Sequence, residues 1–155
     1  MTPALQPLLA LLALAERERD ASLAAHQRAS RAAQQAAAQS EQLVGYRSDY
    51  ERRWTTQFRT EGTMPVVHCY QGFMNRLGQA VAHQETVIDR ANRQLADAER
   101  VLREHELRVA SVRKLIERRQ HELRLGADRR DQKATDEFAA RAAWNRDGGL
   151  GAGAH

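Results

Sequence analysis

Apolar residues recur every three or four positions over much of the chain, most regularly in its second half. Stepping alternately by four and three residues from Leu77 selects fourteen positions, of which eleven are apolar. Charged residues such as Asp89, Arg90, Arg103 and Glu104 lie between them. The selected positions are Leu77, Val81, Gln84, Ile88, Ala91, Leu95, Ala98, Leu102, His105, Val109, Val112, Ile116, Arg119 and Leu123. This heptad spacing predicts a long helix that packs against another helix.

The first half of the chain has a weaker pattern of the same kind. Its start is rich in leucine, with Leu5, Leu8, Leu9, Leu12 and Leu23. Its middle has small alanines, which are Ala29, Ala33, Ala36 and Ala37. Its end has the large residues Leu43, Tyr46, Tyr50 and Trp54. Alanine allows close approach but buries little apolar area. We expect a second helix whose middle contributes least to stability.

Helix-breaking residues divide the chain once. Between Pro7 and about residue 60 there is no further proline. The next helix-breaking segment is Glu61-Gly62-Thr63-Met64-Pro65. Glycine commonly ends a helix, and proline is tolerated in the first turn of the next one. The prediction is an all-α fold of one domain, residues 1–147: a helix over about 7–60, a bend over about 61–66, and a helix over about 67–144, forming an antiparallel coiled-coil hairpin.

The two helices differ in length, which predicts an overhang. A bend centred near Thr63 sets Tyr46 beside Ala80 and leaves the C-terminal helix without a partner beyond about Leu123. The last eight residues, 148–155, contain four glycines. That composition predicts a disordered tail.

The composition and charge of the chain do not point to a particular kind of ligand. Charged residues make up 28% of the chain and aromatic residues 5%, and the net charge is +4. The excess is mostly arginine and is spread among acidic residues, so nucleic-acid binding is not favoured. A basic coiled-coil nucleic-acid binder remains an alternative, and its binding would weaken steeply with salt.

No constellation for catalysis or metal binding is visible. The chain has one cysteine, Cys69, and six histidines that do not repeat at ligand spacing. We expect no enzyme activity, no cofactor, no metal and no small-molecule substrate. The apolar run of residues 8–15 resembles part of a signal peptide, but no Lys or Arg precedes it, and it merges into Glu16-Arg17-Glu18-Arg19. We interpret it as the start of a helix in a cytoplasmic protein.

Two groups of residues are candidate partner sites. Gln39, Leu43, Tyr46 and Tyr50 share one helical face by their spacing, and so do Phe73, Leu77, Ala80 and Gln84. They fit the contact between the helices near the bend, but two tyrosines and a phenylalanine exceed what two helices can bury. An exposed aromatic stripe is typical of a partner-binding surface.

The second group lies in the predicted overhang, residues 131–144. Its charges allow pairs four residues apart, such as Glu137 with Arg141. Phe138 and Trp144 have no predicted partner inside the chain. A frayed helix end and a partner-binding helix both fit this pattern.

Three motifs resemble the FliJ family of the flagellar export apparatus. They are the N-terminal leucine pattern from Leu5 to Leu23, the pattern Leu43-x-x-Tyr46-Arg47-x-x-Tyr50 followed by Phe73-x-x-x-Leu77, and Asp131-Gln132-Lys133-x-x-Asp136-Glu137-Phe138-Ala139-x-Arg141. The resemblance covers essentially residues 4–146. Where some family members have a histidine, this chain has Gln84 with His83 beside it.

The resemblance implies a central-stalk-like rod of flagellar type III export. Such a rod would act in the cytoplasm at the inner membrane, bind the hexameric export ATPase FliI and promote its assembly, and contact the cytoplasmic domain of the gate protein FlhA. It would also meet a FliH-type regulator and export chaperones. The related stalk protein of virulence secretion systems is the alternative.

Residues can be assigned to two of these roles through the matching motifs. The implied gate-binding residues are Gln39, Leu43, Tyr46, Tyr50, Phe73, Leu77 and Ala80. The implied ATPase-contacting residues are Gln132, Lys133, Asp136, Glu137, Phe138 and Arg141.

Overall fold

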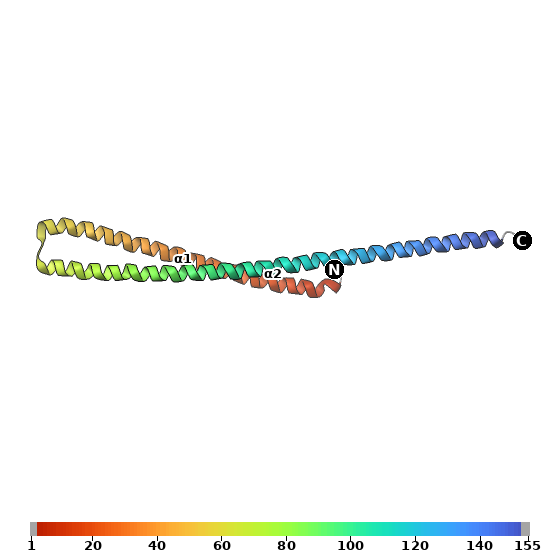
Figure 1. Cartoon of the computed structure of the whole chain (residues 1–155), viewed down its shortest axis with the longest axis horizontal. Coiled ribbons are helices and arrows are strands. Elements are labelled where there is room, and N and C mark those ends of the chain that lie inside the picture. Colours follow the sequence, from red (N-terminus) through yellow and green to blue (C-terminus); the bar gives the residue numbers. More distant parts are fainter. Residues whose placement is uncertain (1–2, 153–155) are drawn as a thin grey trace. The chain divides into compact units, whose positions relative to one another are not determined.

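The computed structural model describes residues 3–152, which form two long helices after a short first turn (Figure 1). A 3-10 turn, η1 (Pro3–Leu5), leads into α1 (Gln6–Glu61), and α2 (Met64–Ala152) follows. The described residues contain no strand. The all-α fold with two long helices packed against each other is therefore confirmed.

The bend is shorter than the sequence predicts. Only Gly62 and Thr63 lie between the helices. The Val67 N–H donates to the Thr63 carbonyl at 3.1 Å, so Thr63 already begins the hydrogen bonding of α2. Pro65 lies in the first turn of α2. Residues there do not donate a hydrogen bond within the helix, so the missing N–H of proline costs nothing.

The heptad positions predicted for α2 form its contact with α1. From Leu77 to Leu123 every one is buried or half-buried except Arg119. The charged residues between them, such as Asp89, Arg90, Arg103 and Glu104, are exposed. We call these contact positions on either helix the seam.

The seam of α1 is as regular as that of α2, although its sequence does not show it. From Arg19 onward, half-buried or buried residues follow steps of three and four without interruption. They are Arg19, Ser22, His26, Ala29, Ala33, Ala36, Ser40, Leu43, Arg47, Tyr50 and Trp54. Several are polar or small, and only their position against α2 marks them as seam residues.

The chain divides into two compact units, of which one comprises Glu16–Leu107. In this unit α1 and α2 run antiparallel from the bend (Figure 1). Its core is alanine-rich: Ala33, Ala36 and Ala91 are buried, with Val87, Ile88 and Leu95 packed against them. This core fits the predicted thin middle of α1.

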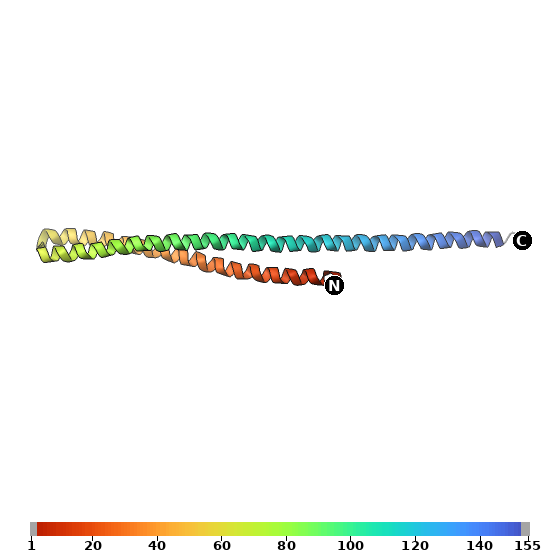
Figure 2. The ribbon, with the colours of Figure 1, turned by 60° about the horizontal axis from the view of Figure 1, so that its bottom comes forward.

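The other unit joins Met1–Ala15 to Arg108–His155. Its buried apolar residues are Leu5, Ala15, Val109, Val112 and Ile116. In this unit α2 continues well past the first turns of α1 (Figure 2), and every residue from 128 to 141 is exposed. The predicted overhang is confirmed.

The end of α2 differs from the sequence expectation. We predicted a disordered tail from residue 148, whereas α2 extends to Ala152. Glycine costs a helix only about 1 kcal/mol relative to alanine, so the backbone hydrogen bonds of α2 can continue through this segment. The last three residues of the predicted tail, 153–155, lie outside the described part of the chain.

Candidate partner-binding surfaces

The stripe of predicted gate-binding residues lies on one side of the hairpin near the bend. We call these seven residues the bend stripe: Gln39, Leu43, Tyr46, Tyr50, Phe73, Leu77 and Ala80. Leu43, Tyr50 and Leu77 are half-buried seam residues. Tyr46 is 56% exposed and Phe73 is 36% exposed, so part of the aromatic surface faces solvent. The structure thus brings the two halves of the stripe together.

Ring contacts hold the two helices together at this end. The Tyr50 and Phe73 ring centroids are 4.8 Å apart, with an interplanar angle of 59°. The Trp54 and Tyr70 rings are 5.0 Å apart. Tilted aromatic pairs at such distances add a favourable electrostatic term to apolar burial. Both pairs lie within one helical turn of the register that a bend at Thr63 predicts.

A polar contact marks the other end of the stripe. The side-chain amide of the buried Gln84 donates to the Ala36 carbonyl at 3.0 Å and to Gln39 Oε1 at 3.2 Å. Gln84 occupies a seam position, and these bonds satisfy its amide nitrogen. They also fix the side chain of Gln39 beside the apolar part of the stripe.

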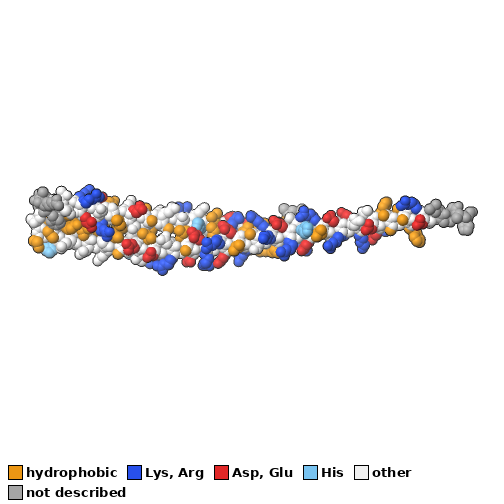
Figure 3. All heavy atoms as spheres, turned by 45° about the horizontal axis from the view of Figure 1, so that its top comes forward, with side chains coloured by type: hydrophobic (Ala, Val, Ile, Leu, Met, Phe, Trp, Pro, Cys, Tyr) orange, Lys and Arg blue, Asp and Glu red, His pale blue; other side chains and the backbone are white. Residues whose placement is uncertain are grey.

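The bend stripe carries no charged side chain, but an arginine lies beside it. The Arg53 guanidinium carbon is 6.0 Å from the Tyr50 ring centroid, at the outer limit of a cation–π contact. On the face shown in Figure 3, apolar side chains reach the surface near the bend. The exposed surface can therefore offer a partner aromatic and aliphatic contacts next to a positive charge.

The predicted ATPase-contacting residues lie on the exposed part of α2. All six are exposed: Gln132, Lys133, Asp136, Glu137, Phe138 and Arg141. Gln132 Nε2 donates to Asp136 Oδ1 at 3.0 Å, and the Thr135 hydroxyl donates to the Asp131 carbonyl at 2.9 Å. Glu137 and Arg141 are exposed, and the expected pair between them does not form in the described structure.

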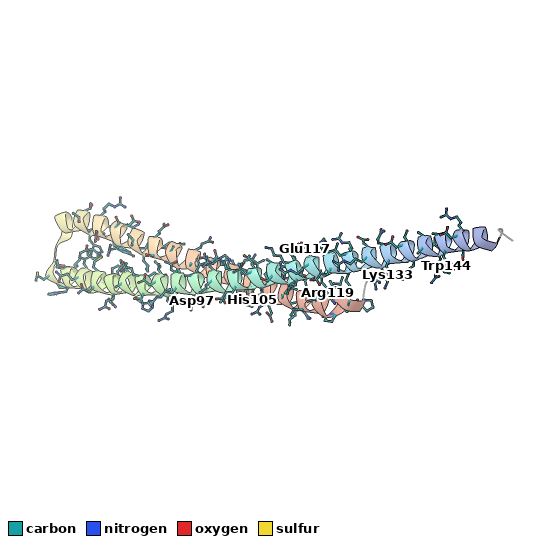
Figure 4. All side chains as sticks on the ribbon, turned by 45° about the vertical axis from the view of Figure 1, so that its right-hand side comes forward. Asp97, His105, Glu117, Arg119, Lys133 and Trp144 are labelled. Carbon is teal, nitrogen blue, oxygen red and sulfur yellow. The ribbon has the colours of Figure 1, made fainter. Side chains whose placement is uncertain are left out.

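Two aromatic side chains in this segment are almost fully open to solvent. Phe138 is 75% exposed and Trp144 is 78% exposed. Beside Trp144, an open groove of about 410 Å³ is lined by Ala140, Arg141 and Asn145 as well. Figure 4 shows Lys133 and Trp144 on the stretch of α2 that has no segment of α1 beside it within this unit. Large exposed aromatics flanked by charges are typical of interface anchors.

The described residues offer no site for other chemistry. No group of three or more His, Cys, Asp or Glu side chains among them could hold a metal ion. Cys69 is free and exposed. None of the described helices is apolar enough over a sufficient length to cross a membrane.

A comparison with protein families matches the Flagellar FliJ protein family over residues 4–148. The chain belongs to the FliJ family. Members are non-catalytic components of flagellar type III protein export, and this chain is therefore an export component. The match includes both the bend stripe and the exposed segment of α2. A comparison with curated proteins found no match.

Sequence reasoning left two contacts near the bend unpredicted. Trp54 and Tyr70 pair across the helices, and Arg53 lies over Tyr50. Extending the heptad steps backward from Leu77 reaches Tyr70, so the spacing held a signal for that contact. Arg53 follows Tyr50 by three residues on α1, a spacing that sets their side chains next to each other, so the sequence held a signal for that contact as well.

Proposed function

We propose that this protein acts as a stalk-like rod in flagellar export, with its exposed C-terminal segment in the export ATPase ring and its bend stripe on the export gate. The observation that carries the proposal is the exposure of Phe138 and Trp144 on a stretch of α2 that has no segment of α1 beside it within its unit. A helix that exposes two large aromatics this far gains from burial in a second protein.

Family membership and this exposure support the ATPase part of the proposal. The hexameric FliI ATPase supplies the chemistry, while the rod supplies an interaction surface that promotes ring assembly. A FliH-type regulator and export chaperones are the further partners that the family implies, and the place of action is the cytoplasmic side of the inner membrane.

ATP hydrolysis by the cognate export ATPase tests this part. The intact chain should stimulate hydrolysis, and a truncation after Leu125 should abolish stimulation while retaining the paired part of α1 and α2. Circular dichroism of the truncated chain checks that its remaining helices persist. Equal stimulation by both chains would remove the exposed segment of α2 from the mechanism.

The gate-binding part rests on the bend stripe. Tyr46→Ala should weaken binding to the cytoplasmic domain of FlhA by about tenfold or more, because aromatic anchors at interfaces dominate binding energy. The matched control is Val44→Ala, which truncates a residue of α1 that is 41% exposed and lies on the opposite side of the seam. Isothermal titration calorimetry measures both. Equal losses, or no loss from Tyr46→Ala, would contradict the assignment.

A further inference from the structure

Two arginines lie next to rings of the bend stripe, one on each helix. Arg53 follows Tyr50 by three residues on α1, and its guanidinium carbon is 6.0 Å from the Tyr50 ring centroid. Arg76 follows Phe73 by three residues on α2, a spacing that sets the two side chains next to each other. Arg76 Nε donates to the Gly72 carbonyl at 3.3 Å, so the guanidinium stays close to the turn that carries Phe73. Both arginines are exposed.

The acidic residue nearest to these arginines is already paired. Asp49 follows Tyr46 by three residues, so it lies on the same side of α1 as the exposed Tyr46 ring. Arg52 Nη2 lies 2.6 Å from Asp49 Oδ1, which neutralises this carboxylate within α1. Arg53 and Arg76 form no ion pair with any of the described residues. Two positive charges beside the rings are therefore left uncompensated.

The other acidic residues near the bend lie on the opposite side of the seam. We call residues 39–57 of α1 and 64–85 of α2 the bend end. Tyr46 and Phe73 directly precede seam positions, whereas the acidic residues either directly follow one or lie within a turn of Val44, which places them across the seam. They are Glu41, Glu51 and Glu85, all exposed. The remaining arginine of the bend end, Arg47, is a half-buried seam residue.

Charge at the bend end is thus divided between two sides. The side with the exposed rings has the unpaired Arg53 and Arg76 together with the neutral pair of Asp49 and Arg52, and the other side has three carboxylates. A guanidinium group presents a planar set of donors that matches a carboxylate in a bidentate contact. A protein surface that covers the exposed rings gains most if it is acidic where it meets the two arginines.

We propose that Arg53 and Arg76 are further gate-binding residues, and that the cytoplasmic domain of the gate protein meets the bend stripe with two carboxylates beside an apolar surface. Each arginine requires its own carboxylate. Trp54 contacts Tyr70 across the helices, so Arg53 lies level with about that residue, and Arg76 is six residues further along α2, about 9 Å away along the axis. This inference rests on the proposed gate binding and adds the chemistry of the partner surface.

A second copy of the chain fits this side less well than the gate protein does. In each copy the unpaired carboxylates and the unpaired arginines of the bend end lie on different sides. Contacts between copies would therefore join unlike surfaces and build open-ended assemblies instead of a closed dimer.

Charge reversal at each arginine tests the proposal. Isothermal titration calorimetry measures binding of the full chain to the cytoplasmic domain of the gate protein. Arg53→Glu and Arg76→Glu should each weaken binding about three- to tenfold, because each loses one surface ion pair and gains a repulsion. Arg103→Glu makes the same change of charge at an exposed position of α2 outside the bend end, and should stay within about twofold. Circular dichroism checks that all three variants remain helical.

Salt dependence separates an ion pair from a loss of packing. Raising the salt concentration from about 50 to 500 mM should weaken binding of the unaltered chain, because salt screens exposed charge pairs. The double variant Arg53→Gln/Arg76→Gln should show a smaller change over the same range. Equal salt dependence of the two chains would contradict the proposed carboxylate contacts.

The outcomes distinguish this inference from the proposed function. If Tyr46→Ala weakens binding while Arg53→Glu and Arg76→Glu act no more strongly than Arg103→Glu, the inference is wrong and gate binding by the bend stripe stands. If the unaltered chain does not bind the gate domain, the proposed gate binding is wrong and the inference fails with it. Self-association of the free chain that Arg53→Glu abolishes, measured by sedimentation velocity, would assign the arginines to a second copy instead.

Discussion

Polar side chains occupy several seam positions of this hairpin, and one of them is hydrogen-bonded from helix to helix. Gln84 is buried and bonds across to Ala36 and Gln39. His105 also occupies the seam, and its Nδ1 is buried without a hydrogen-bond partner in the described structure, 3.6 Å from Glu18 Oε2. A buried polar group is costly unless bonded, so a satisfied one favours the single alignment that pairs it.

Replacing Gln84 tests how much these cross-helix hydrogen bonds contribute to stability. Gln84→Ala removes both cross-helix bonds and leaves a small void, and should lower the free energy of unfolding by about 1–2 kcal/mol. Urea unfolding followed by circular dichroism measures the change. Gln79→Ala, at an exposed position of the same helix, is the control and should stay within about 0.5 kcal/mol. Equal effects would mean that the Gln84 bonds contribute nothing.

At the scale of the element, the two helices differ in how much of their seam can be predicted from their own sequences. The seam of α2 follows directly from its apolar spacing, and the structure confirms it. The seam of α1 does not, because positions such as Arg19, Ser22, Ser40 and Arg47 look like surface residues in isolation. Their burial is imposed by the register of α2. That part of the aromatic surface near the bend is exposed was predictable by counting aromatics, whereas which ring is most exposed, Tyr46, depends on how α1 faces α2.

The alanine core of the unit Glu16–Leu107 should tolerate little added side-chain volume. Ala36 is 3% exposed within a core of three alanines. Ala36→Leu adds side-chain volume where the helices approach closely, and should destabilise the hairpin by about 1–3 kcal/mol despite the added apolar surface. Thermal unfolding by circular dichroism measures this. Ala38→Leu, two residues away and exposed, should be nearly neutral. A stabilising Ala36→Leu would show that the seam there is loose.

In each unit of the molecule, α2 pairs with α1 along one stretch, and only in the unit that holds its C-terminal part does α2 continue without α1 beside it. Paired stretches of α1 and α2 lie in both units, while Phe138 and Trp144, beyond the pairing, are exposed. Family membership over residues 4–148 assigns this arrangement to flagellar export. The sequence predicted the exposed end from helix lengths alone, but a partner for it cannot be predicted from this chain alone, because binding depends on the surface of the other protein.

Site-specific photo-crosslinking tests the central claim most directly. A photoreactive phenylalanine analogue placed at Phe138 in the full chain, mixed with the cognate export ATPase and ATP, should crosslink to the ATPase. The same analogue at Tyr46 should not crosslink to the ATPase, but should crosslink to the cytoplasmic domain of the gate protein. Absence of the first crosslink, with ATPase hydrolysis still stimulated, would show that the ring meets another part of the chain and would contradict the account.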